Sequence, residues 1–519
     1  MLRYSNPIVP ARSSIARIFS SQVKPQRVLG DQWSFRTPNR SFGSTLVCSS
    51  RAAERQPRSG SQRRSADKKK TPVVSEFQPA VYEGMDSVKK FLSAGRCVVV
   101  LQPGKSKLFY DGNPVVFGGA VQGKLVGWGL YNSDSMYRVR MLWLESMDGK
   151  SDDEKDFTMF NIIKKRLTNA AAIRSALSLP DEETNAYRLI NGEGDRLSGV
   201  AIDVYSNWVV ISSSARWVEI HKDVIMEAVK AVVPVTSEVV WRQSIDRLRQ
   251  DGFDIPTRAS RSNADEELQE EDLDKDEISE PAGKQESAES TIISEYGVKF
   301  VVSPKLGQKT GHYLDQRDNR YVLGKLCKGK SVLDTFCYSG GFSLHAALNG
   351  ATRVDAVDSS DAALKLAKLW RFRHQQLADS WCRMNAELNG VAEVVSLHKA
   401  DVGDFLTEQV GKGCQWDVVI LDPPKLAPSR KDLERAKTKY KKLNKAAMQT
   451  VKPGGLLLSC TCSAAMAQSG ELIDVIKTCA SELGRQVTLL KVLGAGGDHT
   501  ILPAFPEGQY LCGYLIAVL

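Results

Sequence analysis

The chain has 519 residues, of which 42% are hydrophobic and 25% are charged, so it is expected to be globular with two or three domains. No apolar stretch approaches the length of about 18 residues that a transmembrane helix needs, and no membrane partner is expected. The ten cysteines form no CxxC pair. That spacing argues against a zinc site or a disulfide framework and favours a reducing compartment.

The net charge of +9 is unevenly distributed. Residues 1–70 hold about 15 Lys and Arg against 3 Asp and Glu, whereas residues 262–290 hold about 12 acidic side chains against 2 basic ones. The remaining body keeps a charge of about +7. A mildly basic body is compatible with a nucleic-acid partner but does not demonstrate one.

Residues 1–75 are rich in Ser and Arg, poor in acids and without hydrophobic periodicity. This composition is typical of an organellar transit peptide, and a disordered basic tail is the alternative. The stretch 46–52 resembles a plastid processing region. We therefore expect an organellar protein, in the chloroplast in preference to the mitochondrion.

Short strands separated by glycine turns predict a small β-barrel over residues 85–170. They are expected near residues 97–101, 117–121, 126–132 and 137–142, and a helix over 160–176 follows. Further along we expect a tight connection at 187–195, a strand at 208–212 and an amphipathic helix at 218–232. The acidic stretch 255–290 predicts a disordered insertion.

Residues 321–519 repeat a pattern of strand, glycine loop and helix, which predicts a doubly wound parallel α/β sheet. Its expected strands are 331–334, 353–358, 394–398, 416–421 and 455–459, with a closing antiparallel hairpin of 487–492 and 510–518.

The first loop of this predicted sheet runs from Asp334 to Ser343 and contains Gly340 and Gly341. It is neither a GxGxxG fingerprint nor a phosphate-binding loop with GK[ST]. Asp358 ends the second strand and Asp401 follows the third. Each acid alone is typical of a helix cap, but three acids at successive strand ends favour a nucleoside cofactor.

Two further strands carry reactive groups at their carboxyl ends. The strand 417–421 ends in Asp422-Pro423-Pro424-Lys425, and the apolar run 455–458 leads to Cys460 and Cys462. Open α/β sheets place their chemistry at these ends, so a thiol is expected to lie near a carboxylate. Cys460 and Cys462 are two residues apart and should point to the same face of a strand.

Four longer motifs carry a resemblance to a known family. They are the segments 307–320, 188–195, 385–390 and 505–511. Together with the strand ends, they resemble class I S-adenosylmethionine-dependent methyltransferases. More narrowly, residues 85–519 resemble bacterial large-subunit ribosomal RNA cytosine-5 methyltransferases with an N-terminal PUA domain.

This resemblance implies a Rossmann-like methyltransferase sheet at 321–519, a PUA RNA-binding barrel at 85–170 and a β-rich connecting domain at 180–320. It also implies S-adenosylmethionine as cofactor. The residues it implies for cofactor binding are Asp334, Phe336, Cys337, Tyr338, Ser339, Gly340, Asp358, Asp401, Gln316 and Arg317. Surface salt bridging is the alternative role for Arg317 and Arg320.

The resemblance also implies that Cys462 is the nucleophile, adding to C6 of cytosine so that C5 can accept a methyl group. Asp422 would bind the N3/N4 edge of the base. Lys425 stands where many RNA cytosine-5 methyltransferases have a second cysteine, so a one-cysteine mechanism is implied. Asp422 and a water remain alternative acceptors for the C5 proton, and Cys460 is expected to pack in the core.

The base must leave its stack to reach Cys462, so a flipped or single-stranded nucleotide in RNA, most plausibly ribosomal RNA, is expected. Lys425, Arg430 and Lys431 open a basic stretch that would contact phosphates, with a solvated helix as the alternative. Two other functions stay open: methylation of another ring position, such as guanine N7, and a non-catalytic role in RNA binding or ribosome assembly. Residues 369–384 depart from the family pattern.

Overall fold

The computed structural model describes residues 80–82, 98–100, 115–116, 125–148, 158–233, 238–254, 290–305, 307, 309–359, 381–427 and 429–519. The predicted transit peptide, the acidic insertion up to residue 289 and residues 369–380 lie outside these ranges. Among the described helices, none has the length and apolar character needed to cross a bilayer.

The first sheet has five strands in the order β2-β1-β4-β5-β3. Its strands are β1 (Ala80–Tyr82), β2 (Val98–Val100), β3 (Val115–Val116), β4 (Leu125–Tyr131) and β5 (Val139–Leu144), followed by the short helix α3 (Glu145–Asp148). Strands β1 and β2 are parallel and the other pairs are antiparallel. Arg166 ties this sheet to the following helix by donating to Asp148 and to the Leu142 carbonyl.

A second sheet, with four strands in the order β6-β7-β8-β9, follows in the sequence. Its elements are α4 (Met159–Ala176), β6 (Ala186–Asn191), β7 (Val200–Tyr205), β8 (Trp208–Ser213), α5 (Arg216–Ile220), α6 (Lys222–Val232), β9 (Val239–Gln243) and α7 (Ile245–Gln250). The single helix expected at 218–232 is two helices, because His221 leaves helical geometry. A hairpin of β10 (Thr291–Glu295) and β11 (Val298–Val302) follows.

The C-terminal sheet has seven strands in the order β14-β13-β12-β15-β16-β18-β17. They are β12 (Ser331–Thr335), β13 (Arg353–Asp358), β14 (Val395–Lys399), β15 (Trp416–Leu421), β16 (Val451–Thr461), β17 (Val487–Gly494) and β18 (Cys512–Val518). All neighbours are parallel except β18, which is antiparallel to both β16 and β17. The doubly wound sheet and its closing hairpin are therefore confirmed.

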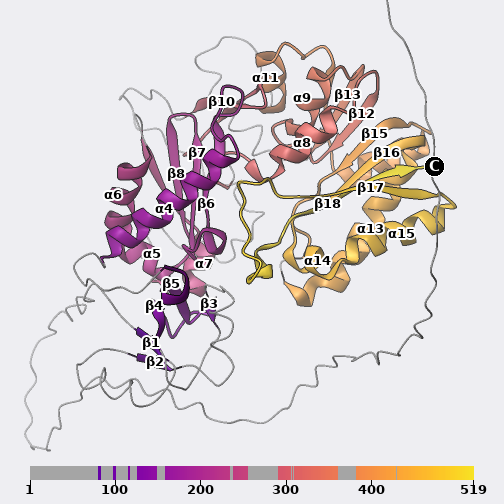
Figure 1. The fold of residues 1–519 in the computed structure, drawn as a ribbon. Helices are drawn as coiled ribbons and strands as arrows, with labels where there is room; N and C mark the ends of the chain where they lie inside the picture. The colour runs from indigo at the N-terminus through magenta and orange to yellow at the C-terminus, as the bar shows by residue number, and fades with distance from the viewer. Residues whose placement is uncertain are drawn as a thin grey trace, which may run out of the picture. The chain divides into compact units, whose positions relative to one another are not determined.

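Helices cover both faces of this sheet, as Figure 1 shows. Val418 and Ile420 of β15 pack toward α8 (Arg317–Gly324) and α9 (Gly341–Leu348). Val419 and Leu421 pack on the opposite face, toward α12 (Val402–Gly411), α13 (Leu433–Gln449) and α15 (Glu471–Leu483). Two buried faces explain why the strand sequences are continuously apolar instead of alternating. The parallel strands consequently deliver their carboxyl ends to one edge.

Candidate active site

Asp334 anchors the loop between β12 and α9. It is buried, and its Oδ2 accepts hydrogen bonds from the Ser343 backbone N–H at 3.0 Å and the Ser343 hydroxyl at 2.6 Å. Its Oδ1 is buried and has no hydrogen-bond partner among the described residues. Burial raises the pKa of Asp334 to about 7. The unpartnered oxygen is therefore a position where a ligand donor could be accepted.

The backbone of this loop is tightly coiled. Phe336 and Tyr338 have positive φ values of 62° and 47°, and Gly340, at the start of α9, has 82°. A Cβ at Gly340 would lie only 2.6 Å from the Cys382 sulfur. Glycine is therefore required there by both conformation and space. Ser339 is buried, and its carbonyl accepts from Asn385 at 3.1 Å.

The acids at the next two strand ends take different local roles. Asp358 accepts the Tyr338 backbone N–H at 2.9 Å and so supports the loop directly. Asp401 is exposed and caps α12 by accepting the Asp404 N–H at 3.0 Å. The structure thus brings Asp358 to the loop, whereas Asp401 makes the helix cap that such an acid often forms.

The predicted thiol and carboxylate lie at adjacent strand ends. Cys462 follows β16, and its half-buried thiol is 3.9 Å from the Pro423 carbonyl oxygen. Asp422 accepts a hydrogen bond of 2.9 Å from the Gln316 amide. Burial and the Asp422 carboxylate raise the pKa of Cys462 to about 11, while burial and Asp315 raise the pKa of Asp422 to about 6. Cys460 is fully buried in the core, as expected.

The segment 307–320 places a lysine beside this pair. Lys309 donates to Asp315 at 2.9 Å and lies 4.1 Å above the centre of the Tyr313 ring. Its charge lowers the pKa of both Cys462 and Asp422, against the larger effect of burial. Tyr510 donates to the same Asp315 oxygen at 2.8 Å. Two of the four family motifs therefore meet at Asp315.

Arg317 and Arg320 lie in buried ion pairs. Arg317 donates to Asp498 at 2.9 and 3.2 Å. Arg320 donates to both oxygens of Glu295, which also contacts His312 and His345. Surface salt bridging is therefore wrong for both arginines, because both side chains are almost fully shielded from solvent.

The remaining two motifs hold the site to its surroundings. Asn385 of α11 (Trp381–Leu388) accepts the Val301 N–H at 2.8 Å besides donating to Ser339. In the motif 188–195, Asp195 pairs with Arg174 at 2.6 Å and accepts from Thr500 at 2.9 Å. The Arg188 N–H donates to Asp498 at 2.8 Å. The first motif thus joins the cofactor loop to β11, and the second is hydrogen-bonded to the segment that contains Asp498 and Thr500.

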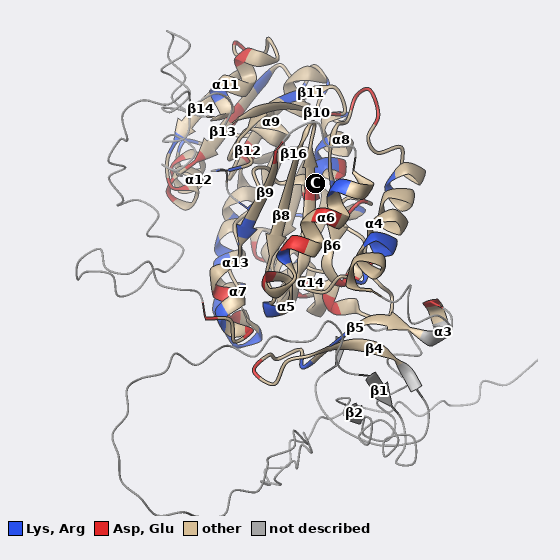
Figure 2. Cartoon of the chain, turned by 90° about the vertical axis from the view of Figure 1, so that its left-hand side faces the viewer, with Lys and Arg blue, Asp and Glu red and all other residues tan. Residues whose placement is uncertain are grey.

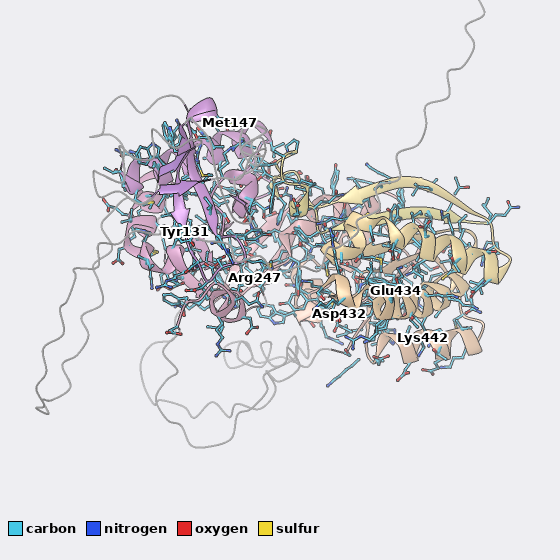
Figure 3. All side chains as sticks on the ribbon, turned by 90° about the horizontal axis from the view of Figure 1, so that it is seen from below. Tyr131, Met147, Arg247, Asp432, Glu434 and Lys442 are labelled. Carbon is cyan, nitrogen blue, oxygen red and sulfur yellow. The ribbon has the colours of Figure 1, made fainter. Side chains whose placement is uncertain are left out.

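The predicted substrate-binding residues Lys425, Arg430 and Lys431 are all exposed. They precede α13, whose basic residues Figure 2 shows in blue. Within α13, Lys437, Lys441 and Lys445 pair with glutamates. Lys442 is exposed, and Figure 3 labels it on the same segment as Asp432 and Glu434. Among described residues, no cluster of His, Cys, Asp and Glu has metal-binding geometry.

Comparisons with known proteins match this arrangement. A family model described as S-adenosylmethionine-dependent methyltransferase matches residues 268–482. The ribosomal RNA large subunit methyltransferase I of Photobacterium profundum is 34% identical over 410 residues, which cover 78% of this chain and 91% of that protein. Its counterpart from Shewanella amazonensis is 30% identical over 440 residues, covering 81% and 99%. The chain belongs to the ribosomal RNA large subunit methyltransferase I family.

Solved structures agree on the fold of this methyltransferase. A putative S-adenosylmethionine-dependent methyltransferase from Streptococcus mutans superposes with a TM-score of 0.60 at 20% identity, over 81% of this chain and 99% of its own. A putative methyltransferase complexed with SAH gives 0.58 at 22% identity, over 85% and 100%. The Rossmann-like class I methyltransferase fold is confirmed.

The cofactor of the methyltransferase is S-adenosylmethionine, and the loop residues fit it. Three of these groups lie at or just after the carboxyl ends of β12 and β13. They are the unpartnered oxygen of Asp334, the turn at Gly340 and the half-buried Asp358. These groups would hold the amino acid and ribose parts of such a cofactor through hydrogen bonds.

Sequence reasoning identified Cys462, Asp422 and Gln316 but missed Lys309, Asp315 and Tyr510 as members of the site. The motifs that contain these three residues were recognised, so the signal was present. Lys309 and Asp315 are near neighbours in the sequence, but their meeting with Tyr510 depends on a tertiary contact across 195 positions.

Proposed function

We propose that this methyltransferase forms 5-methylcytosine in large-subunit ribosomal RNA, with Cys462 as nucleophile. The observation that carries the proposal is the position of the Cys462 thiol, 3.9 Å from the Pro423 carbonyl and next to Asp422. A methyltransferase acting on an amine or on guanine N7 needs no thiol there. The names of the bacterial relatives support ribosomal RNA as the substrate.

The chemistry requires a thiolate because C5 of cytosine is a weak nucleophile. The Cys462 sulfur would form a bond to C6, and the π electrons of the C5–C6 bond would then make C5 electron-rich. S-adenosylmethionine, when bound, supplies the electrophilic methyl group that C5 takes. Loss of the C5 proton restores the double bond and breaks the S–C6 bond, which returns the thiolate.

Asp422 is assigned to the polar edge of the base. The Gln316 amide fixes one of its oxygens, and a pKa of about 6 leaves the carboxylate charged at neutral pH. A charged carboxylate can accept from the cytosine amino group and stabilise positive charge at N3 while C6 is bonded to sulfur. Asp422 and a water remain the two acceptors for the C5 proton.

RNA contacts are assigned to exposed basic residues and to the N-terminal sheet. Lys425, Arg430 and Lys431 lie between the Asp422 strand end and α13, where phosphates flanking a flipped base would pass. Strands β2 to β5 of the first sheet lie within residues 85–170 and support a PUA-type RNA-binding domain there. The composition of residues 1–75 supports import into an organelle, the chloroplast in preference to the mitochondrion. Imaging a fluorescent fusion of that segment checks the destination, and cytosolic fluorescence would refute it.

The deciding experiment compares Cys462→Ala with Cys460→Ala. Organellar ribosomal RNA that lacks the modification is incubated with S-adenosylmethionine and each variant, and cytosine methylation is read by bisulfite sequencing. Loss of the nucleophile should reduce methylation by several orders of magnitude and abolish the covalent RNA adduct. Cys460→Ala should keep both, since that thiol packs in the core.

Cytosine methylation that persists in Cys462→Ala would contradict the role of Cys462 as nucleophile. Methyl transfer to the RNA without any bisulfite-resistant cytosine would favour another ring position, such as guanine N7. A purified protein that binds no S-adenosylmethionine would instead favour a non-catalytic role in RNA binding or ribosome assembly.

A further inference from the structure

Two buried thiols meet beneath the cofactor loop. Cys337 belongs to the loop and is 6% exposed, whereas Cys382 lies in the first turn of α11 and is fully buried. Both are free cysteines, and their side chains share a hydrogen bond. They form a small cluster with Ala356 of β13. Cys337 is a predicted cofactor-loop residue, but neither thiol takes part in the methyl transfer proposed above.

The contact places Cys382 against the most constrained part of the loop. The positive φ values of Phe336 and Tyr338 flank Cys337, and the Cys382 sulfur occupies the space where a Cβ of Gly340 would lie. Cys382 also falls within residues 369–384, which depart from the family pattern. Cys382 thus lies outside the motifs recognised from the sequence, whereas Cys337 lies within the cofactor loop.

We propose that Cys337 and Cys382 form a reversible disulfide that weakens S-adenosylmethionine binding. The inference goes beyond the proposed function because it depends on the cofactor and not on which base is methylated.

The oxidant is hydrogen peroxide, which is small enough to reach a nearly buried thiol. The Cys337 thiolate attacks one peroxide oxygen, giving a sulfenic acid and hydroxide, which takes up the thiol proton as water. The Cys382 sulfur then attacks the sulfenic sulfur and expels a second water. In total two thiols and one peroxide give one disulfide and two waters, and two electrons pass from sulfur to oxygen.

A disulfide must distort the loop because its S–S bond is about 2.05 Å, shorter than any noncovalent sulfur contact. The Asn385–Ser339 hydrogen bond joins the same loop to α11. The displacement would therefore fall on residues 337–340, where the backbone turns into α9. By linkage, a disulfide that weakens cofactor binding must itself be disfavoured by bound cofactor.

The reaction should be slow at neutral pH. The hydrogen bond with Cys382, together with burial, raises the pKa of Cys337 well above its usual range, so little thiolate is present. Oxidation should accelerate as the pH rises. The pair would then respond to sustained oxidation and not to brief pulses.

The test uses the full chain with Cys462→Ser as background, so that oxidation of the nucleophile does not contribute. The protein is treated with hydrogen peroxide, disulfides are mapped by mass spectrometry of unreduced peptides, and S-adenosylmethionine affinity is measured by calorimetry. Oxidation should yield the Cys337–Cys382 peptide and weaken binding by about tenfold or more, with recovery on adding dithiothreitol. Saturating S-adenosylmethionine should slow disulfide formation.

Cys382→Ser and Cys382→Ala provide two independent ways to remove the partner thiol. Whichever folds should bind the cofactor like the reduced background and lose the response to peroxide. The matched control is Cys479→Ser, since Cys479 is a buried thiol of α15 that contacts a backbone carbonyl instead of another thiol. This control should keep the response.

Three results would overturn the proposal: a disulfide between two other cysteines in place of Cys337–Cys382, a Cys337–Cys382 disulfide with unchanged affinity, or a peroxide effect that persists in both Cys382 variants. Failure of the proposed function looks different. A reduced protein that binds S-adenosylmethionine without methylating cytosine would leave the disulfide inference standing.

Discussion

Cys462 sits between two charges of opposite sign, and these should control its reactivity. Burial and the Asp422 carboxylate raise the pKa of the thiol to about 11, whereas the Lys309 ammonium lowers it. Asp422 itself titrates near pH 6, so it is fully charged wherever Cys462 ionises. Asp422→Asn should therefore lower the pKa of Cys462 and Lys309→Met should raise it.

The measurement is the pH dependence of Cys462 alkylation by iodoacetamide, followed by mass spectrometry of its peptide. Each unit by which the pKa falls should raise the rate at pH 8 about tenfold, because the thiolate is the reacting species. Alkylation of Cys414, a half-buried thiol at the opposite end of β15, should be unchanged in both variants. Shifts in the same direction for both variants would contradict this electrostatic account.

The site residues that lie at the carboxyl end of a strand could be predicted from the sequence. Cys462, Asp422 and Asp334 follow apolar runs, and a strand of known direction fixes where its last side chains emerge. Arg317 could not be judged this way. Its partner Asp498 lies 181 positions away in a loop without a distinguishing pattern.

At the scale of elements, α11 acts as a clamp between the connecting hairpin and the cofactor loop. Asn385→Ala would leave the buried Val301 N–H and the Ser339 carbonyl without their partner. An unsatisfied buried polar group costs about 1–3 kcal/mol, so the urea midpoint should fall clearly. S-adenosylmethionine affinity should fall as well, because the loop loses its anchor.

Asn389→Ala is the matched control, since Asn389 bonds the Lys299 N–H and carbonyl one helical turn further on and near solvent. It should cost less than about 1 kcal/mol and leave cofactor affinity unchanged. Equal effects of the two variants on affinity would show that the loop does not depend on this anchor.

The strands of the catalytic sheet were predictable because burial on both faces makes them apolar throughout. The boundaries of the strands were harder to predict. The expected start of β16 was residue 455, but the strand begins at Val451 and includes a Lys-Pro-Gly-Gly stretch, a sequence typical of turns. The break between α5 and α6 was missed because the apolar spacing continues across His221. Pairing with β15 sets the start of β16, and the backbone conformation of His221 sets the break between α5 and α6.

At the scale of the whole molecule, buried carboxylates connect the layers. Burial alone would raise the pKa of Asp498, but His499 and Arg317 hold it well below its usual range. Arg320, His312 and His345 do the same for Glu295. A carboxylate with a lowered pKa stabilises the fold above its unfolded pKa of about 4, and this contribution is lost as the pH falls further.

Asp498→Asn should therefore lower the free energy of unfolding at pH 7 by about 3 kcal/mol or more, since Arg317 is left buried without its counter-charge. Urea titrations should show the gap between parent and variant narrowing as the pH drops below about 4. Glu408→Gln removes an exposed ion pair with Lys412 and should change the free energy of unfolding far less than Asp498→Asn at either pH. A gap that widens on acidification would contradict the assigned sign.

The place of β18 between β16 and β17 has a consequence for synthesis on the ribosome. Both neighbours leave the exit tunnel earlier, yet neither can pair with the other, because β18 fills the space between them. Until residues 512–518 emerge, the nascent chain carries an open hydrogen-bonding edge on β16, next to the nucleophile. Such an edge is a template for wrong strand pairing. Strand β16 therefore gains its last partner, and loses this exposed edge, only when the end of the chain has been made.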